Sequence, residues 1–281
     1  MPFSLIFTKL VRSALIFIAI VVASPAMATS LWDQIQASGE VRVGSIDNRV
    51  PFMYKKDDKL SGFTVRISED LVSALSNAMG KPIKVTYVPT TWATVVLDLQ
   101  AGRVDVMFTM AATPERAKAL DLFGPLYDLQ SVAISSSANT IGTQWSYFNN
   151  PQTPISVIAG SADETIAKNN LPNGQIRSMK DQAGAVLDVQ SGNSKAWITS
   201  VVNALNIQKN NPNFNKTVVL KPVVTQSSGG GIRKDVDGRF HTFLNGWSFV
   251  YRASGASKKA MIDSITEAGL SVDALPKDFD L

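Results

Sequence analysis

Cysteine is absent from this sequence of 281 residues, and histidine occurs once, as His241. Without cysteine the chain has no disulfide, thiolate metal site, cysteine nucleophile or lipid-modified cysteine. One histidine also argues against a histidine-dependent catalytic triad and a multi-histidine zinc site. We therefore predict no metal site, no cofactor and no catalytic residue. His241 lies beside Phe240 and Phe243 in an expected helix, and we interpret it as structural or surface-exposed.

A large excess of charge of either sign is also absent from the sequence. Lysine and arginine number 27 against 23 aspartates and glutamates, which gives a formal net charge of +4. Lys9 and Arg12 belong to the N-terminal leader, so the remainder carries a charge of about +2, and it contains no block rich in basic residues. We expect no nucleic-acid partner.

Long apolar runs are also few, and the one from Ala14 to Ala23 follows a short basic region and precedes Ala26-Met27-Ala28. This order is typical of a cleaved secretory signal peptide. An uncleaved membrane anchor is the alternative, but spanning a bilayer needs about 20 apolar residues. We predict a signal peptide over residues 1–28. The mature protein would then start near Thr29 and reside in the periplasm without a lipid anchor.

Strand-like and helix-like patterns alternate along the rest of the chain. Expected strands cover residues 40–45, 83–88 and 104–109, and expected helices cover residues 65–80, 92–102 and 113–120. A similar order of elements restarts after Tyr127, and the chain from Gly238 onward is mainly helical in pattern. Alternation of this kind predicts an α/β architecture with a largely parallel sheet. Two such units joined by two extended crossings predict two lobes with a hinge and a ligand cleft between them.

Arg116 stands out in the stretch "DVMFTMAATPERAKALDLFGPLY". Thr113 and Pro114 suit the cap and first position of a helix, which places Arg116 in the first turn. The helix dipole disfavours a cation there unless an anion joins it. Backbone N–H groups, a threonine hydroxyl and a guanidinium together suit a carboxylate. Spacing alone leaves two readings open, a carboxylate-binding arginine and a solvated surface arginine. Trp92 is equally open, as a flat wall for a ligand or as a core residue.

Six stretches resemble the bacterial extracellular solute-binding proteins of family 3, the polar amino-acid receptors of ABC importers. They are "GEVRVGS" (39–45), "VPFMY" (50–54), "KLSGFTVRISEDLVSAL" (59–75), "LQAGRVDVMFTMAATPERAKALDLFGPLY" (99–127), "IAGSADETI" (158–166) and "GGGIRKD" (229–235). They occur in family order over nearly the whole mature chain, and the fourth is the most specific.

The resemblance implies a two-lobed periplasmic binding protein fold of type II-like topology. Lobe one would take residues 29–132 and 226–281, and lobe two residues 133–225, with hinge crossings near Ser131–Ser135 and Val224–Ser228. Binding of a solute would close the lobes. The closed form, which we expect to be a monomer, would then dock on an inner-membrane ABC permease.

The resemblance also implies roles for individual residues. Arg116 would grip a ligand carboxylate, with Thr109 and Ala111 as backbone and hydroxyl partners and Trp92 as an aromatic wall. In the second lobe, the N–H groups of Ser161 and Ala162 would meet the same carboxylate.

The sequence departs from the family pattern where a ligand ammonium is usually held. Ser200 replaces an aspartate, and Lys195 replaces another acidic residue nearby. Arg49 stands at a site position that is commonly aromatic, and Asp47 is one residue away from a position that often carries an acid. A buried ammonium without a carboxylate is costly. We therefore expect a small carboxylate-bearing ligand that is either an amino acid or an organic acid such as a dicarboxylate.

Two other functions are compatible with the same fold. One is a periplasmic dehydratase acting on carboxylated cyclohexadienes, which needs a general acid near the carboxylate grip, with Asp47 and Asp163 as candidates. The other is a binding module that reports its ligand state to a membrane receptor. Solute capture for an importer is the expected function, and the protein is expected not to be an enzyme.

Overall fold

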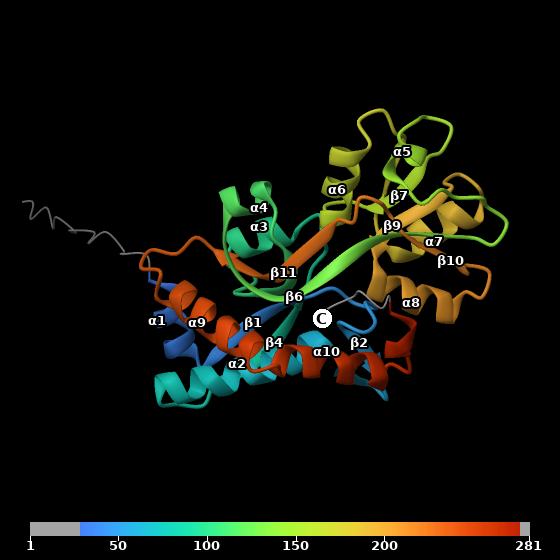
Figure 1. The fold of residues 1–281 in the computed structure, drawn as a ribbon. Coiled ribbons are helices and arrows are strands. Elements are labelled where there is room, and N and C mark those ends of the chain that lie inside the picture. The colour runs from blue at the N-terminus through green and yellow to red at the C-terminus, as the bar shows by residue number, and fades with distance from the viewer. Residues whose placement is uncertain (1–28, 276–281) are drawn as a thin grey trace, which may run out of the picture.

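The computed structural model describes residues 29–275 and places them in two lobes (Figure 1). The predicted signal peptide, residues 1–28, lies outside the described residues. Within residues 29–275 no helix is long and apolar enough to cross a membrane. Two long strands run from one lobe into the other, β6 (Leu120–Ser135) and β11 (Thr225–Arg233).

The first lobe combines the N-terminal part of the chain with the C-terminal helices. Its elements are α1 (Leu31–Ser38), β1 (Glu40–Ser45), β2 (Tyr54–Lys56), β3 (Lys59–Ser61), α2 (Phe63–Met79), β4 (Lys84–Pro89), α3 (Val95–Gln100), β5 (Met107–Ala111), α4 (Pro114–Ala119), α9 (Arg239–Ala253), α10 (Ala256–Glu267) and η1 (Val272–Ala274). Helix α2 forms as its spacing predicts, because Ile67, Leu71 and Leu75 recur on one buried face and Gly80 ends it at φ +65°. His241 of α9 is structural, since its Nε2 lies 2.8 Å from the carbonyl oxygen of Leu122.

The second lobe repeats the alternation of strands and helices. Its elements are α5 (Trp145–Phe148), β7 (Ile155–Ile158), α6 (Ala162–Asn170), β8 (Ile176–Met179), α7 (Gln182–Gln190), β9 (Ala196–Ser200), α8 (Val201–Asn210) and β10 (Lys216–Val219). A separate apolar cluster fills the space between β7, α5 and α6 and includes Trp145, Phe148 and Ile155. Parallel pairing of β7 with both β8 and β9 fits the predicted α/β pattern.

The expectation of a largely parallel sheet is wrong. The main sheet has the order β5-β11-β6-β9-β7-β8, with β10 also paired to β6, and all pairs that involve β6 or β11 are antiparallel. The two crossing strands produce this mixture. Each runs antiparallel to the strands beside it, whereas β7, β8 and β9 are connected through helices and pair in parallel. Strand β6 pairs with β11 up to Gln130 and with β9 from Ser131. That change of partner falls near the predicted boundary between residues 132 and 133, and the boundaries themselves stay a prediction.

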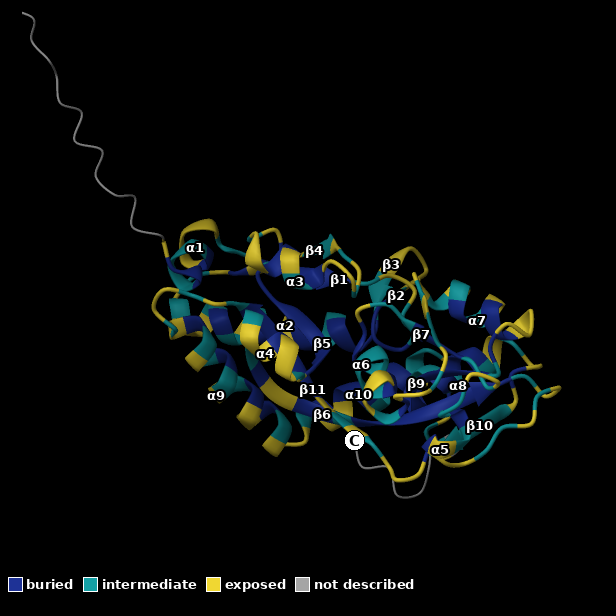
Figure 2. Ribbon diagram, turned by 90° about the horizontal axis from the view of Figure 1, so that it is seen from above, coloured by how far each residue is buried: buried dark blue, intermediate teal, exposed yellow. Residues whose placement is uncertain are grey.

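Strand β6 is longer than the sequence pattern suggests, since it begins directly after α4 and includes the extended segment expected from Ser131 onward. Alternation of polar and apolar residues is typical of strands that have one solvent-exposed face and one buried face. Much of β6 is instead buried on both faces where the lobes join, so the period of two is lost. Figure 2 shows this buried path along β6 through the middle of the molecule.

A bulge in β5 shapes the cleft edge of the first lobe. Gly229 of β11 pairs with Met110 and Gly230 pairs with Phe108, so Thr109 is the extra residue between them. Its φ of +57° is unusual for a β-branched residue and turns its side chain out of the ladder. On the other side of β11, strand β6 comes so close that a Cβ on Gly229 would lie 2.0 Å from the carbonyl oxygen of Phe123. Gly229 is therefore required by the close packing of β11 against β6.

Candidate functional site

Arg116 reaches the cleft from the short helix α4. Thr113 caps this helix, its Oγ1 accepting from the backbone N–H of Arg116 at 3.2 Å, and Pro114 takes the first helical position. Arg116 is 6% exposed. The alternative reading of Arg116 as a solvated surface arginine is therefore wrong.

The Arg116 guanidinium touches both lobes. Its Nη1 donates to the carbonyl oxygen of Ala111 at 2.9 Å, and its Nη2 donates to the carbonyl oxygen of Gly160, in the second lobe, at 3.0 Å. Its central carbon lies 5.1 Å from the centre of the Trp92 ring. Among residues 29–275 it forms no ion pair. Burial lowers the pKa of Arg116 to about 10, opposed by Asp163 and reinforced by Arg49. Arg116 is thus a buried cation that acidic residues of this part of the chain influence at a distance, Asp163 foremost, without forming an ion pair with it.

A second guanidinium, that of Arg49, enters the site from the loop between β1 and β2. Its Nη1 donates to Oγ1 of Thr109 at 3.2 Å, so the bulge supplies its hydrogen-bond partner. Its central carbon lies 4.6 Å from the Phe52 ring centre and 4.9 Å from that of Trp92. Burial lowers the pKa of Arg49 too. Cation–π contacts of this kind hold the side chain without neutralising its charge.

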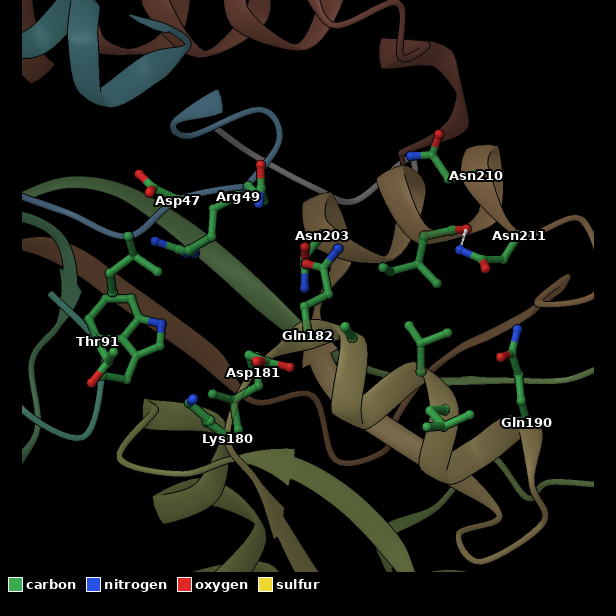
Figure 3. Close-up of a pocket in the computed structure, with 18 residues that line it drawn as sticks. Asp47, Arg49, Thr91, Lys180, Asp181, Gln182, Gln190, Asn203, Asn210 and Asn211 are labelled. Atoms are coloured by element: carbon green, nitrogen blue, oxygen red, sulfur yellow. Dashed lines mark hydrogen bonds between the residues drawn. The ribbon is translucent and has the colours of Figure 1, made fainter. Parts of the chain in front are cut away.

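A cavity of about 570 Å³ opens between the lobes at Arg49 and Trp92 (Figure 3). Helices α7 and α8 line its other side with amide side chains and apolar residues. Its lining residues are Ile46, Asp47, Asn48, Arg49, Thr91, Trp92, Ile158, Lys180, Asp181, Gln182, Ala183, Val186, Leu187, Gln190, Asn203, Ile207, Asn210 and Asn211. Trp92 is thus a wall of this cavity that also packs against two guanidinium groups.

Arg116 and the remaining predicted site residues are buried and are not among the residues that line the cavity. Thr109 and Ala111 contact the two arginines as described. Ser161 caps α6, its Oγ accepting from Glu164 at 3.2 Å, while its own N–H donates to Ile158, and Ala162 is the first residue of that helix. Ser200 caps α8 in the same manner. Their predicted contacts with a ligand stay predictions.

Asp163 and Gln226 form a pair that spacing alone did not connect. Asp163 lies in the first turn of α6, and its Oδ1 accepts from Nε2 of Gln226 at 2.5 Å. The same Nε2 lies 2.9 Å from Oγ of Ser131, whose register partner in β9 is Ser200. A partly buried carboxylate therefore lies near the strand position where the family aspartate is missing. Burial raises the pKa of Asp163 to about 6, although Gln226, Arg49 and Arg116 all act to lower it.

This raised pKa predicts a pH-dependent gain from Asp163→Asn. Since the folded pKa is about 6 against 3.8 for the free group, the carboxyl favours folding below pH 4, and that contribution is lost as the pH rises through 6. Asparagine stays neutral throughout. The unfolding free energy of the variant minus that of the wild type should increase by about 2 to 3 kcal/mol between pH 4 and pH 7.5.

Urea unfolding of both proteins at the two pH values, followed by tryptophan fluorescence, measures this difference. Other titrating groups are shared by the two proteins and cancel to first order. A difference that stays constant from pH 4 to pH 7.5 would show that Asp163 titrates normally.

Comparison with known proteins gives a match over much of the chain. The model of the bacterial extracellular solute-binding proteins, family 3, matches residues 41–225. A probable histidine-binding protein of Campylobacter jejuni is 27% identical over 173 residues, which are 61% of this chain and 64% of that protein's length. A putative amino-acid ABC transporter-binding protein of Vibrio harveyi is 25% identical over 248 residues, 88% of each chain.

Solved structures share the two-lobed architecture. The ancestral amino acid-binding protein AncCDT-1, described as a precursor of cyclohexadienyl dehydratase, has a TM-score of 0.69 and 28% sequence identity. The comparison covers 83% of this chain and 97% of that one. A solute receptor for L-cysteine from Neisseria gonorrhoeae has a TM-score of 0.71 at 22% identity, covering 88% of this chain and 98% of the other, and supports the fold alone.

Proposed function

Because this chain belongs to the bacterial extracellular solute-binding proteins of family 3, we propose that it captures a small carboxylate-bearing solute, an amino acid or an organic acid, for an ABC importer. The solute binds between lobe one, residues 29–132 and 226–281, and lobe two, residues 133–225. Closure about β6 and β11 encloses it. The protein works in the periplasm as a monomer and delivers its solute to an inner-membrane permease.

The observation that carries this proposal is the buried guanidinium of Arg116, which forms no ion pair within residues 29–275. Burying a charge without a partner is costly, and a carboxylate meets a guanidinium fork with two charge-assisted hydrogen bonds. Arg116 already contacts carbonyl groups of both lobes, at Ala111 and Gly160. A carboxylate at this guanidinium therefore lies where the lobes meet, and its binding favours the closed form.

A dehydratase activity is not proposed. Asp47, one of the two candidate acids, is exposed and accepts from Ser45 at 3.0 Å. The relatives are named as binding proteins, and so is the solved ancestral precursor of a dehydratase. The name of the Vibrio harveyi relative also favours a role with an ABC transporter over one with a sensory receptor.

A thermal-shift screen of the mature protein tests the proposal. The panel contains amino acids, hydroxy acids, dicarboxylates and aromatic acids, each beside its methyl ester or amide. A ligand present at 100 times its Kd stabilises the folded state by about 2.7 kcal/mol, so a carboxylate should raise Tm by several degrees while its ester does not.

Equal shifts with acids and with their esters would contradict a carboxylate grip. Absence of any shift, or turnover of prephenate by the purified protein, would contradict solute capture as the function.

A further inference from the structure

We propose that the solute carries two acidic groups, and that Arg49 holds the second while Arg116 holds the first. This inference rests on the proposed function and specifies the substrate class as a small dicarboxylate. The position of Arg49 within the cleft carries it.

Arg49 has donors to spare inside the cavity. A guanidinium has five N–H donors, and the side-chain hydrogen bond that Arg49 forms within residues 29–275 is the one to Thr109. The group forms no ion pair in that part of the chain. Phe52 and Trp92 hold it by their ring faces, and it lines the cavity wall. Arginine in this setting is suited to a planar anion such as a carboxylate.

Arg49 and Arg116 are also close enough to be served by one small molecule. Both pack against Trp92, with central carbons 4.9 and 5.1 Å from its ring centre, so their separation cannot exceed the sum of these distances. Two like charges this near one another are unfavourable in a poorly solvated cleft. A molecule with a carboxylate at each end relieves both charges, whereas a single carboxylate leaves one cation unpaired.

The balance of partly buried charge points the same way. Among residues 29–275, Asp163 is the acidic residue that acts on both arginines, so these three groups carry a net charge of +1 when all are ionised. Asp47, Asp181 and Lys180 also line the cavity, but they are exposed and their charges are screened by solvent. A zwitterionic amino acid with a neutral side chain does not change this imbalance.

Two kinds of molecule with two carboxylates complement this site, depending on whether Asp163 is ionised. Two guanidiniums and an ionised Asp163 complement an acidic amino acid, which has two carboxylates and one ammonium. With Asp163 protonated, the same site complements a dicarboxylate that has no ammonium. The cavity has room for either, and Figure 3 shows Asn203 and Gln182 reaching into it from α8 and α7, on the side opposite Arg49.

Isothermal titration calorimetry at pH 7.5 tests the inference. The probes are succinate, glutarate, adipate, L-aspartate and L-glutamate, with L-asparagine and L-glutamine as matched monocarboxylates. We expect at least one dicarboxylate to bind about 100-fold more tightly than the monocarboxylates. Arg49→Gln should reduce that affinity about 100-fold and bring it close to that of the monocarboxylates.

Lys118→Gln is the control, because it removes one positive charge from an exposed position of α4 outside the cavity. It should change each affinity less than about threefold. Tighter binding of L-glutamate than of glutarate would support the acidic amino acid, and the reverse order would support a dicarboxylate without an ammonium.

If monocarboxylates bind as tightly as dicarboxylates, or if Arg49→Gln leaves the preference intact, the inference is wrong while the proposed function stands. If no carboxylate binds at all, the proposed function fails as well. Circular dichroism and urea unfolding of Arg49→Gln distinguish lost recognition from lost folding.

Discussion

Arg116→Gln is expected to weaken binding of the carboxylate solute by about 100-fold or more, since breaking a buried, hydrogen-bonded charge pair costs 2 to 5 kcal/mol. The effect is large because Arg116 is 6% exposed and forms no ion pair within residues 29–275. Water therefore competes weakly for a carboxylate bound there. Most of the loss should appear as faster dissociation.

Folding of the free protein should respond far less to the same change. Arg116→Gln removes a desolvated charge, which favours folding, and loses a hydrogen bond to Ala111 or Gly160, which opposes it. These effects offset one another to within about 1 kcal/mol. The matched control is Lys118→Gln, two residues away in the same helix and exposed.

Calorimetry gives the affinities, and urea unfolding gives the stabilities. A loss of affinity for Arg116→Gln no larger than that for Lys118→Gln would show that Arg116 does not hold the carboxylate.

Gly160→Ala is expected to prevent full closure of the lobes. A Cβ at Gly160 would lie 2.6 Å from the carbonyl oxygen of Trp92 and 2.9 Å from the backbone nitrogen of Ala93, both in the opposite lobe. These are backbone atoms, so the overlap is not relieved by rotating a side chain. The lobes must separate, which also lengthens the hydrogen bond from Arg116 to the Gly160 carbonyl.

Separating this effect from backbone strain requires a second glycine. Gly160 has φ +73°, where an alanine costs about 1 to 2 kcal/mol without any overlap. Gly192, in the same lobe, has φ +79° and open space around the position of a Cβ. Gly192→Ala therefore carries the strain without blocking closure.

Small-angle scattering with and without solute measures closure, and calorimetry measures affinity. Gly160→Ala should show no solute-dependent decrease in radius of gyration and at least about a tenfold loss of affinity, because the binding-competent form becomes a minor population. Gly192→Ala should close and bind like the wild type. Identical behaviour of the two variants would mean that the contact between Gly160 and Trp92 does not limit closure.

Local features of the first lobe could be predicted from the sequence. Thr113 and Pro114 begin α4 because a capping hydroxyl and a fixed proline φ act within one helical turn. Gly80 and the apolar spacing before it end and orient α2 for equally local reasons. Each feature depends on residues within a few positions of one another, so it can be recognised without knowing the fold.

Pairings between residues far apart in the sequence could not be predicted in this way. Asp163 meets Gln226 at a separation of 63 residues, and Arg49 meets Thr109 across 60. The first hydrogen bond depends on how β6 and β11 join the lobes, and the second, within lobe one, depends on the bulge at Thr109. The residues next to each of these positions in the sequence do not indicate which distant residue it will contact.

By itself, the sequence determined the family, the alternation of strands and helices, and Arg116 as a candidate anchor, because these depend on composition, period and local capping. Tertiary structure decided that Arg116 is buried without an ion pair in the described part of the chain, that Arg49 packs on the same tryptophan ring, and that Asp163 lies near the position of the missing aspartate. The physical reason is that burial and charge pairing are properties of residues brought together from both lobes, and the charge that a solute must carry follows from their sum.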